Sequence, residues 1–374
     1  MMNYSDRSKS FRIFSKHLGP KHGHDKAIRD RALSIAQQHL GENPDKVADH
    51  LAKSLFSIAD ENYDYLAPNN LIVLSNGVSE LKIGSVSIYD CDKVISELSA
   101  RPIDPRVKLV CATGFSVEFS DPLIVSLHPV CWLVRVNALK ENVDEEAKWL
   151  IDVATSAIRL AVEDGEPFFP SFGTLEWHPI NPPRNIKPRV IFHEKGLTLG
   201  DHYTKAFYTI NEKEKARIES AELAPKFGAI LDQQSGTMAE RLGQCLGWLT
   251  RGRQADDRSE RLMFFFTAIE ALVTGNDSSA PVVQNMARNV AVLWTNDMEM
   301  RAQVAKSIKR LYGFRSQTIH TGNRSSSWGN VNECQIIAET LARIVFESVD
   351  LADPHEKFLS ELSIASFGLA WPST

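Results

Sequence analysis

The chain has 374 residues, of which 43% are hydrophobic and 24% are charged. This is the composition of a folded globular protein, and it excludes wholesale disorder, collagen and a long coiled coil. The length predicts two or three domains. The net charge of −5 excludes a uniformly basic nucleic-acid coat and leaves room for a local basic site. Because no run of about 18 apolar residues occurs, we expect no transmembrane helix.

Cysteine usage and the first residues of the chain predict a cytoplasmic protein. The cysteines are scattered and odd in number, and none belongs to a CxxC pair. This pattern favours reduced thiols and argues against a structural zinc site. Residues 1–21 carry basic side chains but no apolar segment of the kind found in a secretory signal. The five cysteines are Cys91, Cys111, Cys131, Cys245 and Cys334.

The beginning of the chain changes from helical to strand-like patterning. Residues 1–66 are expected to be helical, because apolar residues recur there at three-to-four spacing. Short runs rich in Val, Ile, Cys and Phe then predict a mainly antiparallel sheet over residues 67–137. Asn76-Gly77 stands between apolar runs at 71–74 and 81–89, which predicts a hairpin at this point.

A second helix and a proline-rich segment follow the predicted sheet. Residues 144–162 carry an apolar stripe and three acidic residues in the first turn, where carboxylates interact favourably with the helix dipole. Six of the chain's 17 prolines fall between 167 and 190, which predicts a loop. Strands are expected at 189–192 and 207–210, and a linker or solvated helix at 211–219.

From about residue 221 the pattern is helical nearly to the end of the chain, and glycine-asparagine pairs mark helix ends. The candidate helices are 237–250, 257–274, 282–294, 298–319, 331–349 and 355–366. The sequence therefore predicts an α+β protein. A mixed helix and antiparallel-sheet region, residues 1–220, precedes an all-α helical-bundle domain, residues 221–374.

The predicted helix at 298–319 carries a charged residue on its apolar stripe. Arg315 lies four residues after Leu311, so both lie on the same side of the helix. An arginine at such a position needs an ionic partner, a phosphate or a solvent-filled groove, because burying an unpaired charge is costly. Glu270 interrupts the nearly all-apolar segment 262–273, which makes it a candidate ion-pair partner for Arg315.

His320 follows Arg315 by five residues, which corresponds to about 140° of rotation on an ideal helix. The two side chains share a face only if the helix ends or loosens near them. Thr321 and Gly322 predict such an end.

The charge around this position is one-sided, because residues 301–330 contain six basic residues and no Asp or Glu. Such a segment suits a polyanion backbone. A solvated helix face is the other interpretation of the same pattern. The basic residues are Arg301, Lys306, Lys309, Arg310, Arg315 and Arg324.

Two segments resemble the Apea-like branch of the HEPN superfamily over about residues 225–365. They are 262–273 (LMFFFTAIEALV) and 311–320 (LYGFRSQTIH) with the Thr-Gly that follows. The hallmark is an arginine and a histidine four to six residues apart, here Arg315 and His320. Ser316 departs from the pattern, since many catalytic members carry Asn, Asp or His there. No tyrosine stands two residues after His320, which argues against the toxin subtype modified by nucleotidyl transfer.

The resemblance implies a dimerising helical bundle in which two Arg/His motifs meet across the dimer axis. It also implies a metal-independent endoribonuclease of anti-phage (abortive infection) defence and toxin systems. His320 would act as general base or acid while the RNA 2′-hydroxyl attacks the adjacent phosphate. Arg315 would hold that phosphate and stabilise the transition state. No metal or cofactor is expected. Glu270 and Ser316 would support or orient the site, and the RNA contacts would come from Lys306, Lys309, Arg310 and Arg324.

The N-terminal region, residues 1–220, contains no catalytic motif. Together with this absence, the resemblance implies that the region acts as a sensor or regulator, with a phage-derived trigger as its candidate ligand. Structured RNA such as tRNA is a candidate substrate, and mRNA is another. Two alternatives remain open: a non-catalytic nucleotide- or RNA-binding HEPN module, and an assembly partner of another toxin or enzyme. The assembly partner would not bind RNA even at low salt.

Overall fold

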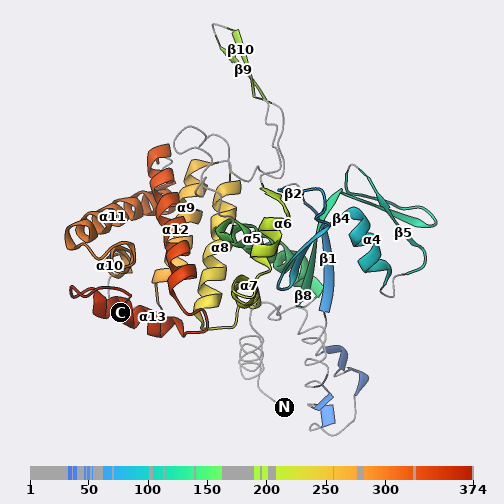
Figure 1. Ribbon diagram of the computed structural model, residues 1–374, viewed down its shortest axis with the longest axis horizontal. Helices are drawn as coiled ribbons and strands as arrows, with labels where there is room; N and C mark the ends of the chain where they lie inside the picture. The colour runs from blue at the N-terminus through green and yellow to red at the C-terminus, as the bar shows by residue number, and fades with distance from the viewer. Residues whose placement is uncertain are drawn as a thin grey trace.

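The computed structural model describes residues 62–69, 71–161, 189–193, 196–200, 208–275, 282–322 and 326–372, except 101–103, 113, 139 and 256, and a few positions between 33 and 53. Most helices gather on one side of the molecule and most strands on the other, with α5 between them (Figure 1). The predicted α+β class is confirmed.

The main sheet is antiparallel and has the strand order β1-β8-β4-β3. The side chains of β8 on one face are buried against α5 (Val143–Ala161), which confirms the helix predicted at 144–162. β1 begins at Asn62, so the helical prediction for residues 1–66 extends too far. The strands are β1 (Asn62–Pro68), β3 (Glu80–Ile83), β4 (Val86–Asp90) and β8 (Val130–Asn137).

The predicted hairpin at Asn76-Gly77 is wrong, although the chain does turn there and Gly77 has φ +95°. β2 (Ile72–Leu74) does not pair with β3. It pairs in parallel with β11 (Tyr208–Ile210), more than a hundred residues later in the chain. Both strands deliver a fully buried isoleucine to the main core, and this burial outweighs the local turn signal. The hairpin forms instead between β3 and β4, at Gly84, where φ is +52°.

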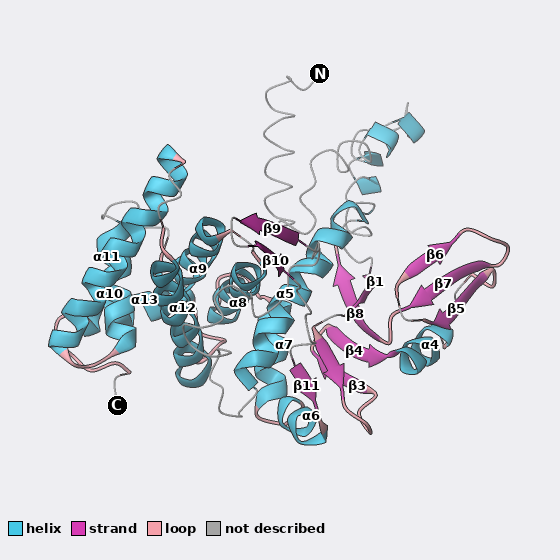
Figure 2. Ribbon diagram, turned by 90° about the horizontal axis from the view of Figure 1, so that it is seen from above, coloured by secondary structure: helices cyan, strands magenta, loops and turns pink. Residues whose placement is uncertain are grey.

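A second, three-stranded sheet projects from the far side of α4 (Figures 1 and 2). Its order is β5-β7-β6, with β5 and β7 parallel and β6 and β7 antiparallel. A small apolar cluster joins α4, β4 and β8 to this sheet. The sequence did not predict α4. The elements are α4 (Cys91–Ser99), β5 (Val107–Cys111), β6 (Ser116–Glu118) and β7 (Leu123–Leu127).

The C-terminal part is helical, and each of the six helices predicted there is present. Side chains of Thr237, Asp257, Asp297 and Ser327 accept hydrogen bonds from the first turns of four of them, which explains where these helices begin. The helices are α6 (Glu212–Ile218), α7 (Leu223–Asp232), α8 (Met238–Gln254), α9 (Arg258–Val273), α10 (Val282–Trp294), α11 (Met298–Thr321), α12 (Trp328–Ser348) and α13 (His355–Ala365).

The expected strands near residue 190 and residue 208 are present as β9 (Arg189–His193) and β11, and β9 pairs with β10 (Gly196–Gly200). Most of the proline-rich loop predicted at 167–190 lies outside the described residues. In the part of the chain that the structure describes, no helix combines the length and apolarity needed to cross a membrane.

A single apolar cluster extends from the main sheet through α5 into the C-terminal helices. α5 packs closely on α8, because Gly247 of α8 has no side chain where the indole of Trp149 lies. The division into domains 1–220 and 221–374 stays a prediction. The apolar core contains residues from both sides of this predicted boundary.

Candidate functional site

Arg315 and His320 lie on one uninterrupted helix, α11. Asp297 caps its start by accepting a hydrogen bond from the backbone N–H of Met300 at 2.7 Å. Gly322 ends it in the left-handed conformation, with φ 66°. The expected helix end therefore comes only after His320. On a continuous helix the two side chains remain about 140° apart, so they do not share a face within one chain.

Arg315 forms the ion pair with Glu270 that the sequence predicted. Its Nη2 donates to Glu270 Oε2 at 3.0 Å. The pair connects α11 to α9 at the edge of the bundle, where the Arg315 side chain is 25% exposed and that of Glu270 is 20% exposed. Tyr312 packs edge-on against Phe266 beside the pair, with ring centroids 5.7 Å apart. The arginine is thus held near the surface rather than sealed in the core.

The pair leaves part of the arginine's hydrogen-bonding capacity unused. Burial raises the pKa of Glu270, and the nearby Arg315 lowers it in opposition. Arg315 Nε is buried without a hydrogen-bond partner. Within the described part of the chain, Glu270 is the only group to which this guanidinium donates. A guanidinium has five N–H donors. Because Nε is buried, an external anionic oxygen at this edge of the bundle would have to bind the Nη donors of the 25% exposed side chain.

His320 belongs to the opposite, solvent-exposed face of α11. At 100° per residue, His320, Lys306 and Lys309 fall within about 60° of one another around the helix axis. All three are exposed. Gly313 lies on the same face, and a Cβ built there would meet no atom within 4 Å. This face therefore offers two lysines and a histidine to an external ligand.

The other basic residues of the segment are placed differently. Arg310 binds Asn330 at 2.6 Å and forms an ion pair with Glu333, so part of its charge is already compensated. Arg301 is 6% exposed and donates to backbone carbonyls, including that of Ala365 at 2.9 Å. It anchors the C-terminal residues, so it is not part of the expected polyanion-binding face.

Two of the predicted site residues remain to be placed, Ser316 and Arg324. Ser316 is partly exposed on α11, one position after Arg315. Arg324 lies outside the described residues. The structure thus brings Glu270 to Arg315, and it places His320 with the two lysines on another face.

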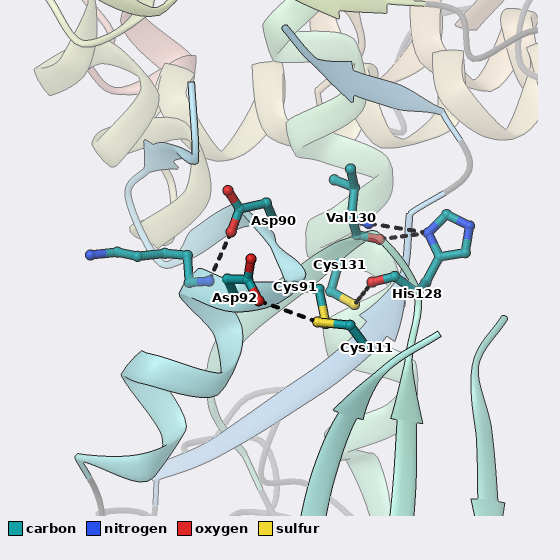
Figure 3. Close-up of a disulfide and its surroundings, with 8 residues drawn as sticks. Asp90, Cys91, Asp92, Cys111, His128, Val130 and Cys131 are labelled. Atoms are coloured by element: carbon teal, nitrogen blue, oxygen red, sulfur yellow. Dashed lines mark hydrogen bonds between the residues drawn. A yellow bond between two sulfur atoms is a disulfide. The ribbon is translucent and has the colours of Figure 1, made fainter. Parts of the chain in front are cut away.

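The expectation of reduced thiols is wrong for two cysteines. Cys91 and Cys111 form a disulfide that links α4 to β5 (Figure 3). Their separation of 20 residues matches no motif, and only the packing of α4 against the second sheet brings their Cα atoms to 5.7 Å. The remaining three cysteines are free and buried. Burial raises the pKa of Cys131 to about 11, and it raises the pKa of Cys245 and Cys334 further.

Sequence analysis also missed a buried network of charged groups. Arg253 and Glu339 are almost completely inaccessible to solvent, and Arg253 Nε donates to Glu339 Oε1 at 2.8 Å. Arg253 Nη1 also donates to Ser156 of α5 at 2.9 Å. The network therefore connects α5, α8 and α12. Apolar periodicity carries no signal for it, because its members interrupt the apolar stripes of three helices that are distant in sequence.

Among the described residues, no group of three or more His, Cys, Asp or Glu side chains is arranged to hold a metal ion. No protein-family model, curated protein or solved structure matches the chain.

Proposed function

We propose that this protein is a metal-independent endoribonuclease of the cytoplasm, whose C-terminal helices cleave RNA with Arg315 and His320. In this reaction the RNA 2′-hydroxyl loses its proton, attacks the adjacent phosphate and displaces the 5′-oxygen of the next nucleotide. His320 serves as base or acid for these proton transfers. Arg315 binds the phosphate and stabilises the negative charge of the transition state.

The observation that carries the proposal is the position of Arg315 and the hydrogen bonds of its guanidinium. Its side chain is 25% exposed, and within the described part of the chain Glu270 is the only acceptor for its Nη groups. A guanidinium oriented by a carboxylate with donors to spare is suited to bind a phosphate. The exposed Lys306 and Lys309 on the same helix add positive charge that attracts an RNA backbone.

The geometry of α11 leads us to include a second copy of the chain in the proposal. One chain presents Arg315 and His320 in directions about 140° apart. In our proposal an active site combines the arginine of one copy with the histidine of another across a dimer axis. Control by the N-terminal region, and a role in abortive infection, belong to the same proposal.

A non-catalytic RNA- or nucleotide-binding module is the second candidate function. The observation that favours it is the angle between Arg315 and His320, together with the ion pair that partly neutralises Arg315. Under this alternative His320 has no chemical role. Arg315→Ala then weakens RNA binding, whereas His320→Ala leaves both the binding and the cellular phenotype intact.

The test is induced expression followed by analysis of total RNA for the wild-type chain, His320→Ala and the control Gln317→Ala. Gln317 is exposed on the same helix. We expect RNA fragments with 2′,3′-cyclic phosphate ends from the wild type and the control, and a loss of about a hundredfold or more with His320→Ala. Cleavage by His320→Ala at the wild-type rate contradicts the mechanism.

A mixing experiment tests the composite site. Arg315→Ala and His320→Ala chains are each expected to be inactive. Co-expression should restore part of the activity, because one of the two sites in a mixed dimer contains both intact residues. No recovery in mixed dimers that are shown to form argues for a site within one chain or for the binding module.

A further inference from the structure

The disulfide lies at the junction between the second sheet and the rest of the molecule. Cys91 is the first residue of α4 and is 5% exposed, whereas Cys111 is the last residue of β5 and is exposed. Because Cys111 is the more exposed residue of the pair, a reagent approaching from solvent is expected to meet it before Cys91.

The two sulfurs also differ in their electrostatic surroundings. The N-terminus of a helix stabilises negative charge, which favours a thiolate on Cys91. The side chain of Asp90 caps α4 by accepting from the backbone N–H of Lys93 at 2.8 Å, which offsets part of this effect. Asp92 Oδ1 lies 3.6 Å from Cys111 Sγ and disfavours a thiolate on that residue. Cys91 is therefore the better leaving group of the pair.

The bond secures a sheet that has few other attachments. Leu109 of β5 and Val125 of β7 pack against the small cluster around Val94 of α4. The outer strand β6 is exposed along its whole length, and Phe119 just beyond it is 90% exposed. Figure 2 shows this sheet beyond α4, projecting away from the C-terminal helices and the main sheet. Apart from the main chain, which leads from β7 directly into β8, the sheet is held by the small apolar cluster, with Leu127 of β7 fully buried in it, and by the disulfide.

We propose that the Cys91–Cys111 disulfide is a thiol-exchange site through which a dithiol protein or a small cellular thiol controls the order of the second sheet. A thiolate attacks Cys111 Sγ, the S–S bond breaks, and the electron pair leaves with Cys91 as thiolate. The mixed disulfide on Cys111 is then resolved by a second thiol, which gives two protein thiols and one oxidised disulfide of the reagent. In the cytoplasm proposed for this protein, disulfides are characteristically transient and redox-sensing.

The other cysteines do not compete for this exchange. Cys131 belongs to the same small cluster, but its Sγ donates to the carbonyl of His128 at 3.3 Å and burial keeps it in the thiol form. Cys245 and Cys334 are completely buried in the helical part. Oxidation and reduction therefore act at one place in the fold.

The experiment treats the purified full chain with dithiothreitol, without denaturant, and follows alkylation and backbone hydrogen exchange. We expect the bond to be present before treatment, and Cys91 and Cys111 alone to become alkylated afterwards. Amides of residues 107–111, 116–118 and 123–127 should then exchange about a hundredfold faster, since a disulfide closing a loop of this size has about that effect on local opening. Amides of β8 should not change.

Matched variants assign the effect to the bond. Cys111→Ser should show the fast exchange with or without reductant, and Cys131→Ser should respond as the wild type does. With limiting reduced glutathione and acid quenching, the mixed disulfide should be found on Cys111. Asp92→Asn should shift part of it to Cys91, because the carboxylate no longer distinguishes the two sulfurs.

Three results would overturn the proposal. The first is finding both thiols free in protein purified without reductant. The second is a bond that is reduced only after the chain unfolds in urea. The third is reduction under native conditions with no change in exchange of the second sheet, since the bond would then control nothing.

Discussion

Arg253 and Glu339 show how single charged side chains are accommodated in this interior. Glu339 Oε1 accepts from Arg253 Nε at 2.8 Å and from Gln335 Nε2 at 3.1 Å. Arg159 Nη2 lies 3.7 Å from the other carboxylate oxygen. Two buried arginines from different helices therefore share one carboxylate, and removing that carboxylate costs more than losing an ordinary hydrogen bond.

We predict that Glu339→Ala lowers the free energy of unfolding by about 3–5 kcal/mol, because the guanidinium of Arg253 loses its buried counter-charge. The control is Glu347→Ala on the same helix. Glu347 pairs with Arg343 at 3.1 Å, but its side chain is 55% exposed. That change should cost at most about 0.5 kcal/mol. Urea unfolding measures both, and equal effects of the two variants would contradict the prediction.

His355 provides a prediction for pH. It is 4% exposed, and its Nε2 donates to the carbonyl of Leu272 at 2.8 Å. Burial lowers its pKa, Arg241 adds to the lowering, and the Leu272 hydrogen bond opposes it. The unfolded chain therefore binds a proton more readily than the folded one. The contribution of neutral His355 to the free energy of unfolding is fully present above the unfolded-state pKa near 6.5. It is lost as the pH falls through the lowered folded-state pKa.

We expect the wild-type chain to lose more stability than His355→Gln when the pH is lowered from 7.5 to 5.5. Glutamine has no titratable group and can still donate to Leu272. The measurement is the urea midpoint of both proteins at the two pH values. Parallel losses in both would show that other groups account for the acid sensitivity.

At the scale of elements, the contact between α5 and α8 decides how the sheet is joined to the helices. Trp149 of α5 lies against the backbone of α8 at Gly247 and meets Trp248 edge-on, with ring centroids 5.6 Å apart. Arg251 covers both indoles, at 4.7 Å from the Trp149 ring and 5.2 Å from the Trp248 ring. The close approach is possible only because residue 247 lacks a side chain.

We predict that Gly247→Ala destabilises the protein by about 1–3 kcal/mol, because the new methyl group collides with the ring of Trp149. Gly228→Ala in α7 is the matched control, since a Cβ at that position meets no atom within 4 Å. It should stabilise the protein by about 0.5–1 kcal/mol through helix propensity. Denaturant unfolding followed by tryptophan fluorescence distinguishes the two. Loss of stability in both variants would mean that packing at residue 247 is not the cause.

At the scale of the whole molecule, the continuous core predicts that the helical region depends on α5. Without α5, the side of α8 that it covers would be open to solvent. The indole of Trp248 would lose its contact with Trp149, and Thr250, which is fully buried in the intact chain, would lose the Asp152 carbonyl to which it donates at 2.6 Å. A fragment of residues 221–374 should therefore bind a hydrophobic dye and unfold without a sharp transition. A fragment that begins at residue 143 should unfold cooperatively. Cooperative unfolding of the shorter fragment would instead support two independent domains.

Local signals in the sequence predicted most of the helices. Apolar residues at three-to-four spacing, with glycine-asparagine pairs at helix ends, predicted the helices that the structure shows as α8, α9 and α11. The same spacing indicated that Arg315 needs a partner and suggested Glu270, a pairing that the structure confirms. These predictions succeeded because they depend on interactions within a few turns of one helix or on the cost of an unpaired buried charge.

The sequence by itself determined the α+β class and the helical C-terminal part. It also determined that the positive charge of Arg315 needs a partner. Only the tertiary structure decided that β2 pairs with β11, that Cys91 meets Cys111, and that Arg315 and His320 point in different directions. The first two depend on which apolar surfaces are buried together. The third depends on where α11 ends, which packing against its neighbours decides. Turn and spacing signals extend over only a few residues, whereas burial couples segments that are far apart in the chain.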